Sequence, residues 1–196
     1  MPVLTASGAG VRQRRRWLFQ DLDVSVEPGE VVAVVGPPGS GRTTLLLSLA
    51  GRFKLSAGRV AIDGPAALGY VPGVTDPEPV FTVTEHLRER RALLGRRGSE
   101  PADLLGLDPA ARGRELTPYE KQLLGLVLAL MANPRVIALD GLDAGLDADE
   151  QAWLLKTLHE IAATGTAVLF TARDINPDQA TTVIRLGRAN ESKETK

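Results

Sequence analysis

The sequence has 196 residues, of which 43% are hydrophobic and 24% charged, and its formal net charge is −1. This length suits one domain with a sizeable core and is too short for two large domains. The balanced charge argues against a dedicated nucleic-acid or membrane-surface binder. The absence of cysteine excludes disulfides, thiolate metal sites and cysteine nucleophiles. Eighteen of the 23 basic residues are Arg, which we interpret as compositional bias.

The N-terminal part predicts a short arm followed by a buried strand. We expect residues 1–17 to form an N-terminal strand and basic arm, in which residues 5–16 are exposed or frayed. No signal peptide is visible there, and the longest apolar run, residues 123–132, is about half of a membrane span. The continuous apolar run 31–35 is typical of a strand that is buried on both faces.

The remaining pattern alternates strands with helices and therefore predicts an α/β fold with a mainly parallel sheet. We expect strands at residues 18–26, 60–62, 68–71, 136–139, 167–170 and 183–186, and helices at 42–50, 83–94, 117–132 and 148–163. The last helix is predicted to carry Trp153 on its apolar face together with Leu154, Leu158 and Ile161. Residues 188–196 are expected to form a polar tail.

Two of these helices begin with a capping-box pattern. Thr82 is followed by Glu85, and Thr117 by Glu120, so each hydroxyl can accept a hydrogen bond from the backbone three residues later. Pro118 adds a proline at the first helical position, where a missing N–H costs nothing.

A glycine-rich segment lies between the buried strand and the first helix, the context that a phosphate-binding P-loop requires. Glycines let successive N–H groups point at one anion, and the helix N-terminus adds its dipole. The pattern asks for Lys where Arg42 stands, and Arg keeps the charge but has a bulkier planar group. The alternative is a glycine-rich turn that binds no ligand. The candidate nucleotide-binding residues are Gly36, Pro37, Gly39, Ser40, Gly41, Arg42, Thr43 and Thr44.

A candidate metal site accompanies this loop. Thr43 is placed to ligate Mg²⁺, and Asp140 ends the apolar strand 136–139, where a carboxylate would hold the metal through water. An Asp at the end of a strand is weak evidence for a metal site when it occurs alone. Its occurrence together with the glycine-rich loop is what supports the prediction.

These motifs, with Gly145-Leu146-Asp147 close behind Asp140, resemble the nucleotide-binding domain of ATP-binding cassette (ABC) transporters. The resemblance covers roughly residues 18–187, and further matching segments are residues 24–30, 44–46, 49–51, 56–64 and 132–135. It implies a P-loop NTPase fold with a RecA-like core, a small antiparallel β region and a short helical subdomain at about residues 73–132.

The resemblance also implies ligands, partners and a location. The ligands are ATP and Mg²⁺, and the partners are separately encoded transmembrane subunits and a second ABC subunit, in a homodimer or heterodimer, with no nucleic acid. The chain would be cytoplasmic and peripheral to the membrane through those partners. The dimer interface would include the signature segment Leu116, Thr117, Pro118, Tyr119 and Glu120, together with Asp147.

Several positions depart from the family pattern. Gly141 stands where the family has the Glu that polarises water, and it has no side chain to accept a proton. Arg173 replaces the switch His, and Gly73 replaces the Q-loop Gln. No aromatic residue lies near positions 11–12, where the family stacks adenine, and we consider Trp17 or an Arg as a substitute.

The signature segment also departs from the family's Leu-Ser-Gly-Gly pattern. Pro118 has no N–H to offer a phosphate, and Tyr119 adds bulk where backbone should approach closely. Since Gly141 damages this chain's own site and Pro118-Tyr119 the site on its partner, we expect ATP binding with weak or absent hydrolysis.

Two other interpretations stay open. The first is a non-hydrolytic regulatory or scaffold protein that uses the ABC fold. The second is an active ATPase in which Asp143 acts as a displaced general base, although a solvated or capping role for this residue is the plainer interpretation.

Overall fold

The computed structural model describes residues 1–95 and 98–187, and it confirms the predicted α/β class. The strands are β1 (Leu4–Gln13), β2 (Arg16–Val26), β3 (Val31–Val35), β4 (Ala57–Ile62), β5 (Ala66–Leu68), β6 (Val136–Leu139), β7 (Ala167–Ala172) and β8 (Thr182–Arg185). The helices are α1 (Arg42–Leu49), α2 (Val83–Leu94), α3 (Pro118–Leu130), α4 (Ala148–Ala163) and a short 3₁₀ turn, Pro177–Gln179. The polar tail predicted at 188–196 lies outside the described residues.

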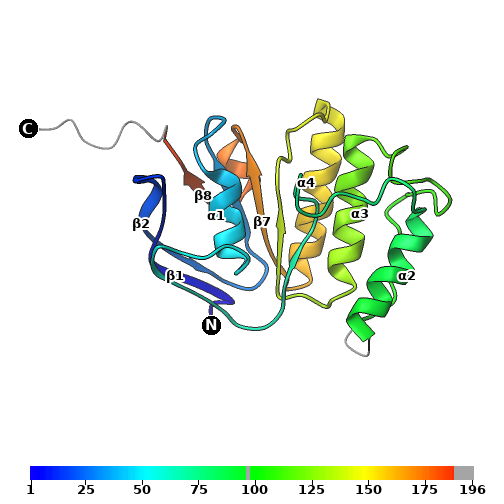
Figure 1. The fold of residues 1–196 in the computed structure, drawn as a ribbon, viewed down its shortest axis with the longest axis horizontal. Coiled ribbons are helices and arrows are strands. Elements are labelled where there is room, and N and C mark those ends of the chain that lie inside the picture. The colour runs from blue at the N-terminus through cyan, green and yellow to red at the C-terminus, as the bar shows by residue number, and fades with distance from the viewer. Residues whose placement is uncertain (96–97, 188–196) are drawn as a thin grey trace, which may run out of the picture.

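Two sheets organise these elements. Five strands pair in parallel in the order β5-β6-β7-β3-β8, and three pair antiparallel in the order β2-β1-β4. In Figure 1 the antiparallel strands lie beside α1, and α3 and α4 stand side by side with α2 beyond them. A parallel core sheet with a small antiparallel sheet is the predicted arrangement.

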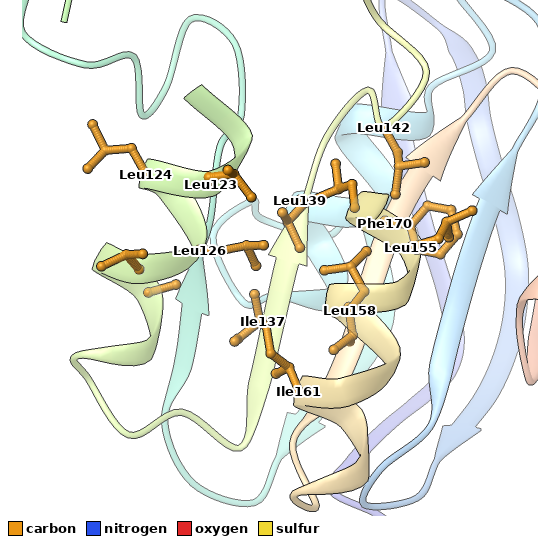
Figure 2. Packing of buried hydrophobic residues seen from close by; sticks show 14 of the residues in the cluster. Leu123, Leu124, Leu126, Ile137, Leu139, Leu142, Leu155, Leu158, Ile161 and Phe170 are labelled. Carbon is orange, nitrogen blue, oxygen red and sulfur yellow. The ribbon is translucent and has the colours of Figure 1, made fainter. Parts of the chain in front are cut away.

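The buried strands place alternate residues on two faces, as the period of two requires. Ile137 and Leu139 of β6 belong to the apolar cluster under α3 and α4, whereas Val136 and Ala138 face the cluster that contains α1 and the antiparallel sheet. Figure 2 shows Leu126 and Leu158 of the two helices beside Ile137. Because both faces are covered, the runs of apolar residues in β3 and β6 carry no polar positions.

All three long helices after residue 80 begin with a complete capping box. The two predicted boxes, Thr82 with Glu85 and Thr117 with Glu120, are confirmed. A third, Asp147 with Glu150 at the start of α4, was not predicted. The hydrogen bonds from Thr82 hold the pKa of the Glu85 carboxyl below its ordinary value, because they favour the charged form.

The expectation that residues 5–16 are exposed or frayed was wrong for residues 5–11, which belong to a paired strand, whereas residues 12–16 are exposed as expected. Residues 4–13 form the central strand of the antiparallel sheet, and Ala6, Ala9 and Val11 are buried. The burial of this strand was not predicted, because its residues are small and only part of one face is apolar. The basic residues that follow form the turn of a hairpin in which Gln13 pairs with Arg16.

Two smaller expectations also need correction. The strand expected at 68–71 ends at Leu68, since the Val71 N–H turns to the Thr75 side chain, 2.8 Å away. Trp153 is 60% exposed and carries the Lys156 ammonium over its ring at 5.4 Å. It therefore lies outside the buried face of α4, next to Leu154, which is fully buried.

The hairpin turn generates a stability prediction. Both central residues, Arg14 and Arg15, have positive φ angles of 45° and 68°, a conformation that costs an ordinary L residue about 1–2 kcal/mol. Asn-Gly is the favoured pair for such a turn. We expect the double substitution Arg14→Asn with Arg15→Gly to raise the free energy of unfolding by about 1 kcal/mol in urea denaturation. Arg59→Asn on β4 is the control, and an unchanged midpoint for the double variant would contradict the strain.

Candidate functional site

The glycine-rich loop connects β3 to α1 and leaves the helix start open. Gly39 and Gly41 have φ angles of 79° and 94°, which are accessible to glycine without strain. Gly41 is the N-cap of α1 and provides no side-chain hydrogen bond. The first N–H groups of the helix therefore remain available to an anion.

The loop is tightly folded against its surroundings. The Pro37 carbonyl accepts a hydrogen bond from the Ser40 N–H at 3.1 Å, and a Cβ added at Gly36 would lie 2.5 Å from the Leu186 carbonyl oxygen. Within α1, the Thr44 carbonyl accepts a 2.7 Å hydrogen bond from the Ser48 hydroxyl. A side chain at Gly36 is thus excluded by the close approach of Leu186 and Ser40.

Two buried donors in this loop have no partner within the described structure. The Ser40 hydroxyl is in a side chain only 1% exposed, and Nη1 of Arg42 is likewise buried, yet neither has a hydrogen-bond partner. Buried polar groups are normally paired, because an unpaired one loses its hydration without compensation. Phosphate oxygens are acceptors that would satisfy both donors.

The predicted metal residues meet. The Thr43 hydroxyl donates to Oδ2 of Asp140 at 2.8 Å, and the Thr171 hydroxyl donates to Oδ1 of the same carboxylate at 2.5 Å. Thr171 also accepts a hydrogen bond from the Gly141 N–H at 2.8 Å. The carboxylate is thus held at the carboxyl end of β6 by side chains from α1 and β7.

This corner suits Mg²⁺ only together with a phosphate ligand. Among the described residues, no group of three or more His, Cys, Asp or Glu side chains could hold a metal ion. Thr43 and Asp140 offer oxygen atoms, the ligands that Mg²⁺ prefers, and Mg²⁺ usually keeps several waters and takes the rest of its shell from substrate phosphates. The residues therefore fit a shared metal–phosphate site.

Sequence reasoning missed two residues at this corner. Thr171 lies in the buried strand β7, and Gln122 on α3 donates from Nε2 to the Asp140 carbonyl at 3.1 Å. Both are almost fully buried, and Oε1 of Gln122 has no partner. The available signal was a polar residue inside an otherwise apolar stretch, which requires a specific buried partner.

The backbone at Gly141 is specific to glycine. Its φ angle is 69°, and a Cβ added there would lie 3.1 Å from the Cβ of Ala144. A side chain at this position would therefore require the turn after β6 to change.

The two candidate replacements for the missing catalytic groups contact each other. Oδ2 of Asp143 accepts a hydrogen bond from the Arg173 N–H at 3.1 Å and lies 3.8 Å from Nε of the same residue. The Asp143 side chain is 20% exposed and that of Arg173 71%. One oxygen of this carboxylate, Oδ2, is thus held by Arg173, whereas a general base needs a lone pair directed at the attacking water.

The segment around Gly73 forms a self-contained turn. Its N–H donates to Oδ2 of Asp76 at 2.7 Å, and the Tyr70 hydroxyl donates to Oδ1 at 3.1 Å. Partial burial, and then the Asp76 carboxylate, raise the pKa of Tyr70 above its ordinary value, so its hydroxyl stays protonated at neutral pH.

The candidate interface residues gather where α3 and α4 begin. Leu116 is buried in the core, while Thr117 and Glu120 cap α3. Pro118 packs against Gly145, where an added Cβ would meet its Cγ at 3.2 Å. Asp147 caps α4 by accepting hydrogen bonds from Asp149 and Glu150.

Tyr119 follows Pro118 at the exposed start of α3. Burial, and then the nearby Glu150 carboxylate, raise its pKa above the ordinary value. Its phenol is therefore protonated at neutral pH, and its ring occupies the place where the family pattern has glycine.

An open hollow of about 260 Å³ adjoins the loop. Besides loop and helix residues, Gln13 and Leu18 of the β1–β2 hairpin line it. Trp17 does not line it, and pairs instead with Arg12, whose guanidinium lies 6.0 Å from the ring centre. Neighbouring residues of a strand point to opposite faces, so the structure argues against Trp17 as a platform for a base in this hollow.

The comparisons with known proteins agree with this geometry. The family model described as ABC transporter matches residues 19–142, more than half of the chain. The chain belongs to the ABC transporter family. The zinc import ATP-binding protein ZnuC of Cereibacter sphaeroides is 31% identical over 184 residues, which cover 90% of this chain and 74% of that protein.

Solved structures show the same ABC fold. The ATP-binding cassette MJ0796, as a dimer bound to ADP and Pi, matches with a TM-score of 0.77 at 19% identity, over 93% of this chain and 94% of that one. The cbiO1 protein of Clostridium perfringens, part of the ABC transporter complex cbiONQ, matches with a TM-score of 0.77 at 17% identity, over 94% and 84%. The chain is thus an ABC-type nucleotide-binding domain. In residues 1–95 and 98–187, no helix has the length and apolarity to cross a bilayer.

The Gly141 backbone leads to a prediction. Gly141→Glu restores the family's residue but places a Cβ in a left-handed conformation, and we expect a loss of about 1–2 kcal/mol in the free energy of unfolding. Gly141→Ala is the matched control and should lose a similar amount, since the penalty belongs to the Cβ. We expect no gain in phosphate release for either variant; full stability together with new turnover in the Glu variant would contradict this account.

Proposed function

We propose that the chain binds Mg-ATP at residues 36–44 and hydrolyses it weakly or not at all, as an ATP-binding subunit of an ABC-type transporter. The observation that carries the proposal is the 2.8 Å hydrogen bond between Thr43 and Asp140 beside two unpaired buried donors, Ser40 and Arg42. Phosphate oxygens would accept from Ser40, Arg42 and the first N–H groups of α1. When bound, Mg²⁺ would neutralise charge on the phosphates.

Weak hydrolysis follows from the groups that surround the expected position of the attacking water. Gly141 carries no base, and its N–H is already bonded to Thr171. Asp143 is paired with Arg173, and the Arg173 guanidinium has no lone pair with which to orient water. Losing a positioned base typically costs about 10²–10⁴ in rate.

A thermal-shift titration tests nucleotide binding. A ligand that binds only the folded chain stabilises it by about 2.7 kcal/mol at a hundredfold excess over Kd, so Mg-ATP should raise the melting temperature. Thr43→Ala removes a metal ligand and should weaken Mg-ATP binding by about tenfold or more, whereas the control Thr157→Ala, whose hydroxyl bonds only within α4, should not. A chain that melts unchanged in millimolar Mg-ATP would instead favour the regulatory or scaffold function.

Phosphate release tests the second half of the proposal. We expect turnover near the background rate, and Asp143→Asn should leave it unchanged, because we assign Asp143 a structural role in holding Arg173 through Oδ2. Turnover at the rate of ordinary transporters that is lost in Asp143→Asn would overturn the proposal in favour of a displaced general base.

A groove of about 510 Å³ beside the Gly73 turn supports a separately encoded membrane subunit as partner. It is lined by apolar residues of the turn, α2 and α3, by the carboxylates of Asp76, Glu78 and Glu89, and by His86 and Arg90. Val74 and Leu93 on its wall are 55% and 76% exposed. An apolar groove with an acidic rim suits a helix that carries apolar and basic side chains.

Co-purification tests this partner. Leu93→Asp should reduce recovery of the chain with a co-expressed membrane subunit, because it places a charge on an apolar wall. The control Trp153→Asp changes another exposed apolar residue, on α4, and should not reduce recovery. Equal recovery of both variants would argue against the groove as the docking site.

A further inference from the structure

One wall of the groove beside the Gly73 turn is a short irregular segment, residues 74–78. All five of these residues line the groove, and we call them the strap. The strap precedes α2, which lies at the opposite end of the molecule from the antiparallel sheet (Figure 1). Its first residues are held by the turn, because the N–H groups of Val74 and Thr75 both donate to the Val71 carbonyl at 3.0 Å.

The far end of the strap is held by His86 of α2, a side chain that is only 5% exposed. Its Nε2 accepts a hydrogen bond from the Glu78 N–H at 2.9 Å. Its Nδ1 lies 2.8 Å from the Thr82 carbonyl oxygen. The ring of Phe81 meets the imidazole edge to face, with the ring centres 5.6 Å apart. One buried side chain thus connects the strap to the start of α2.

These two hydrogen bonds require one protonation state of the His86 ring. A carbonyl oxygen can only accept, so Nδ1 carries the proton that faces Thr82. A backbone N–H can only donate, so Nε2 presents a lone pair to Glu78. An imidazolium carries a proton on both nitrogens and would direct its Nε2–H at the Glu78 N–H. The hydrogen bond to the strap must therefore break when the ring is protonated.

The groove offers a protonated ring other partners. Carboxylates of Asp76, Glu78 and Glu89 line the same groove, and a carboxylate accepts readily from an imidazolium. The residues of α3 that line the groove are uncharged. The charged groups on the elements packed around His86 are Asp76 and Glu78 of the strap, Glu85, Glu89 and Arg90 of α2, and Arg112 and Arg114 of the segment before α3. Protonation thus permits a change of partner from the Glu78 backbone to a carboxylate.

Attachment of the strap is consequently linked to proton binding. The attached strap needs a ring without a proton on Nε2, whereas the released strap does not. A fall in pH therefore shifts the equilibrium toward release, by up to about tenfold per pH unit for a single proton. Imidazole is the side chain that ordinarily changes its charge between about pH 5 and 8, so the shift belongs to a range near neutrality.

We propose that His86 is a pH-sensitive switch of the docking groove. The neutral ring holds the strap as a wall of the groove, and protonation releases the strap and weakens docking of a membrane subunit. The inference rests on the proposed docking at this groove and adds its regulation. The switch itself depends only on contacts within this chain, so it can be tested without the partner.

Hydrogen exchange of the Glu78 amide in the full chain tests the switch. We expect its protection factor, which corrects for the intrinsic effect of pH on exchange, to fall at least about tenfold from about pH 7.5 to about pH 5.5. The Val34 amide in the buried strand β3 is the control and should stay protected. The chain has two His residues, so NMR distinguishes their ring nitrogens. Protonation of Nε2 in His86 should have the same midpoint as the loss of Glu78 protection.

Two substitutions separate the two hydrogen bonds of the ring. Gln carries an acceptor as far along the side chain as Nε2 and does not titrate, so His86→Gln should keep the Glu78 amide protected at both pH values. The shorter Asn reaches only the Thr82 carbonyl, so His86→Asn should lose this protection at both. The matched control His159→Gln removes the other histidine, whose Nε2 lies 3.1 Å from the Gln179 carbonyl oxygen, and should keep the original pH dependence.

Co-purification extends the test to docking. Recovery of the unsubstituted chain with a co-expressed membrane subunit should fall about tenfold or more between the same two pH values. The His86→Gln variant should be recovered equally at both, because its strap stays attached.

Four results would overturn the inference. Glu78 protection that does not change with pH, midpoints that differ in the unsubstituted chain, or a pH dependence that persists in His86→Gln would show that the ring does not control the strap. Equal recovery of the membrane subunit at both pH values, by a chain whose strap is released, would show that the strap does not control docking. If no subunit is recovered at either pH while the Glu78 amide still responds, the proposed docking fails and the switch stands, so the two failures are distinguishable.

Discussion

The hydrogen bond between Thr43 and Asp140 joins parts of the chain that are 97 residues apart in sequence. It forms because β3 and β6 are parallel strands of one sheet, separated by β7, so that their carboxyl ends reach the same edge. The loop after β3 brings Thr43 to that edge, and Asp140 directly follows β6. The proposed phosphate and metal site therefore depends on the register of a sheet whose strands are buried on both faces.

The sequence predicted those parts of the site that rest on local chemistry. The glycine spacing, the capping boxes and the strand-terminal Asp140 are each readable within a few residues, and the structure brings Thr43 and Asp140 together as expected. Thr171 and Gln122 were missed because a polar residue in an apolar run does not reveal its partner. The burial of the predicted N-terminal strand was missed because its small residues gave little alternation, and its position comes from pairing with two other strands.

The departures from the family pattern concern ligand contacts and not the framework of the fold. The buried strands, the helix starts and the metal-side carboxylate follow the family. The groups that would activate water, and the signature segment that would present its backbone to a phosphate, do not. Gly141 shows how far the change extends, because the backbone itself has a left-handed conformation there and the local N–H is bonded to Thr171. The position that lacks the expected base thus also has a backbone conformation that favours glycine.

The capping boxes explain how such changes can accumulate without loss of the fold. In α3 the hydroxyl of Thr117 and the carboxylate of Glu120 cap the helix start, so the cap does not require glycine at the two residues between them. Asp147 and Glu150 do the same for α4. Folding and ligand contact therefore act on different atoms of one short motif, and an evolving chain can exchange one function of that motif for another while its three-dimensional framework stays intact.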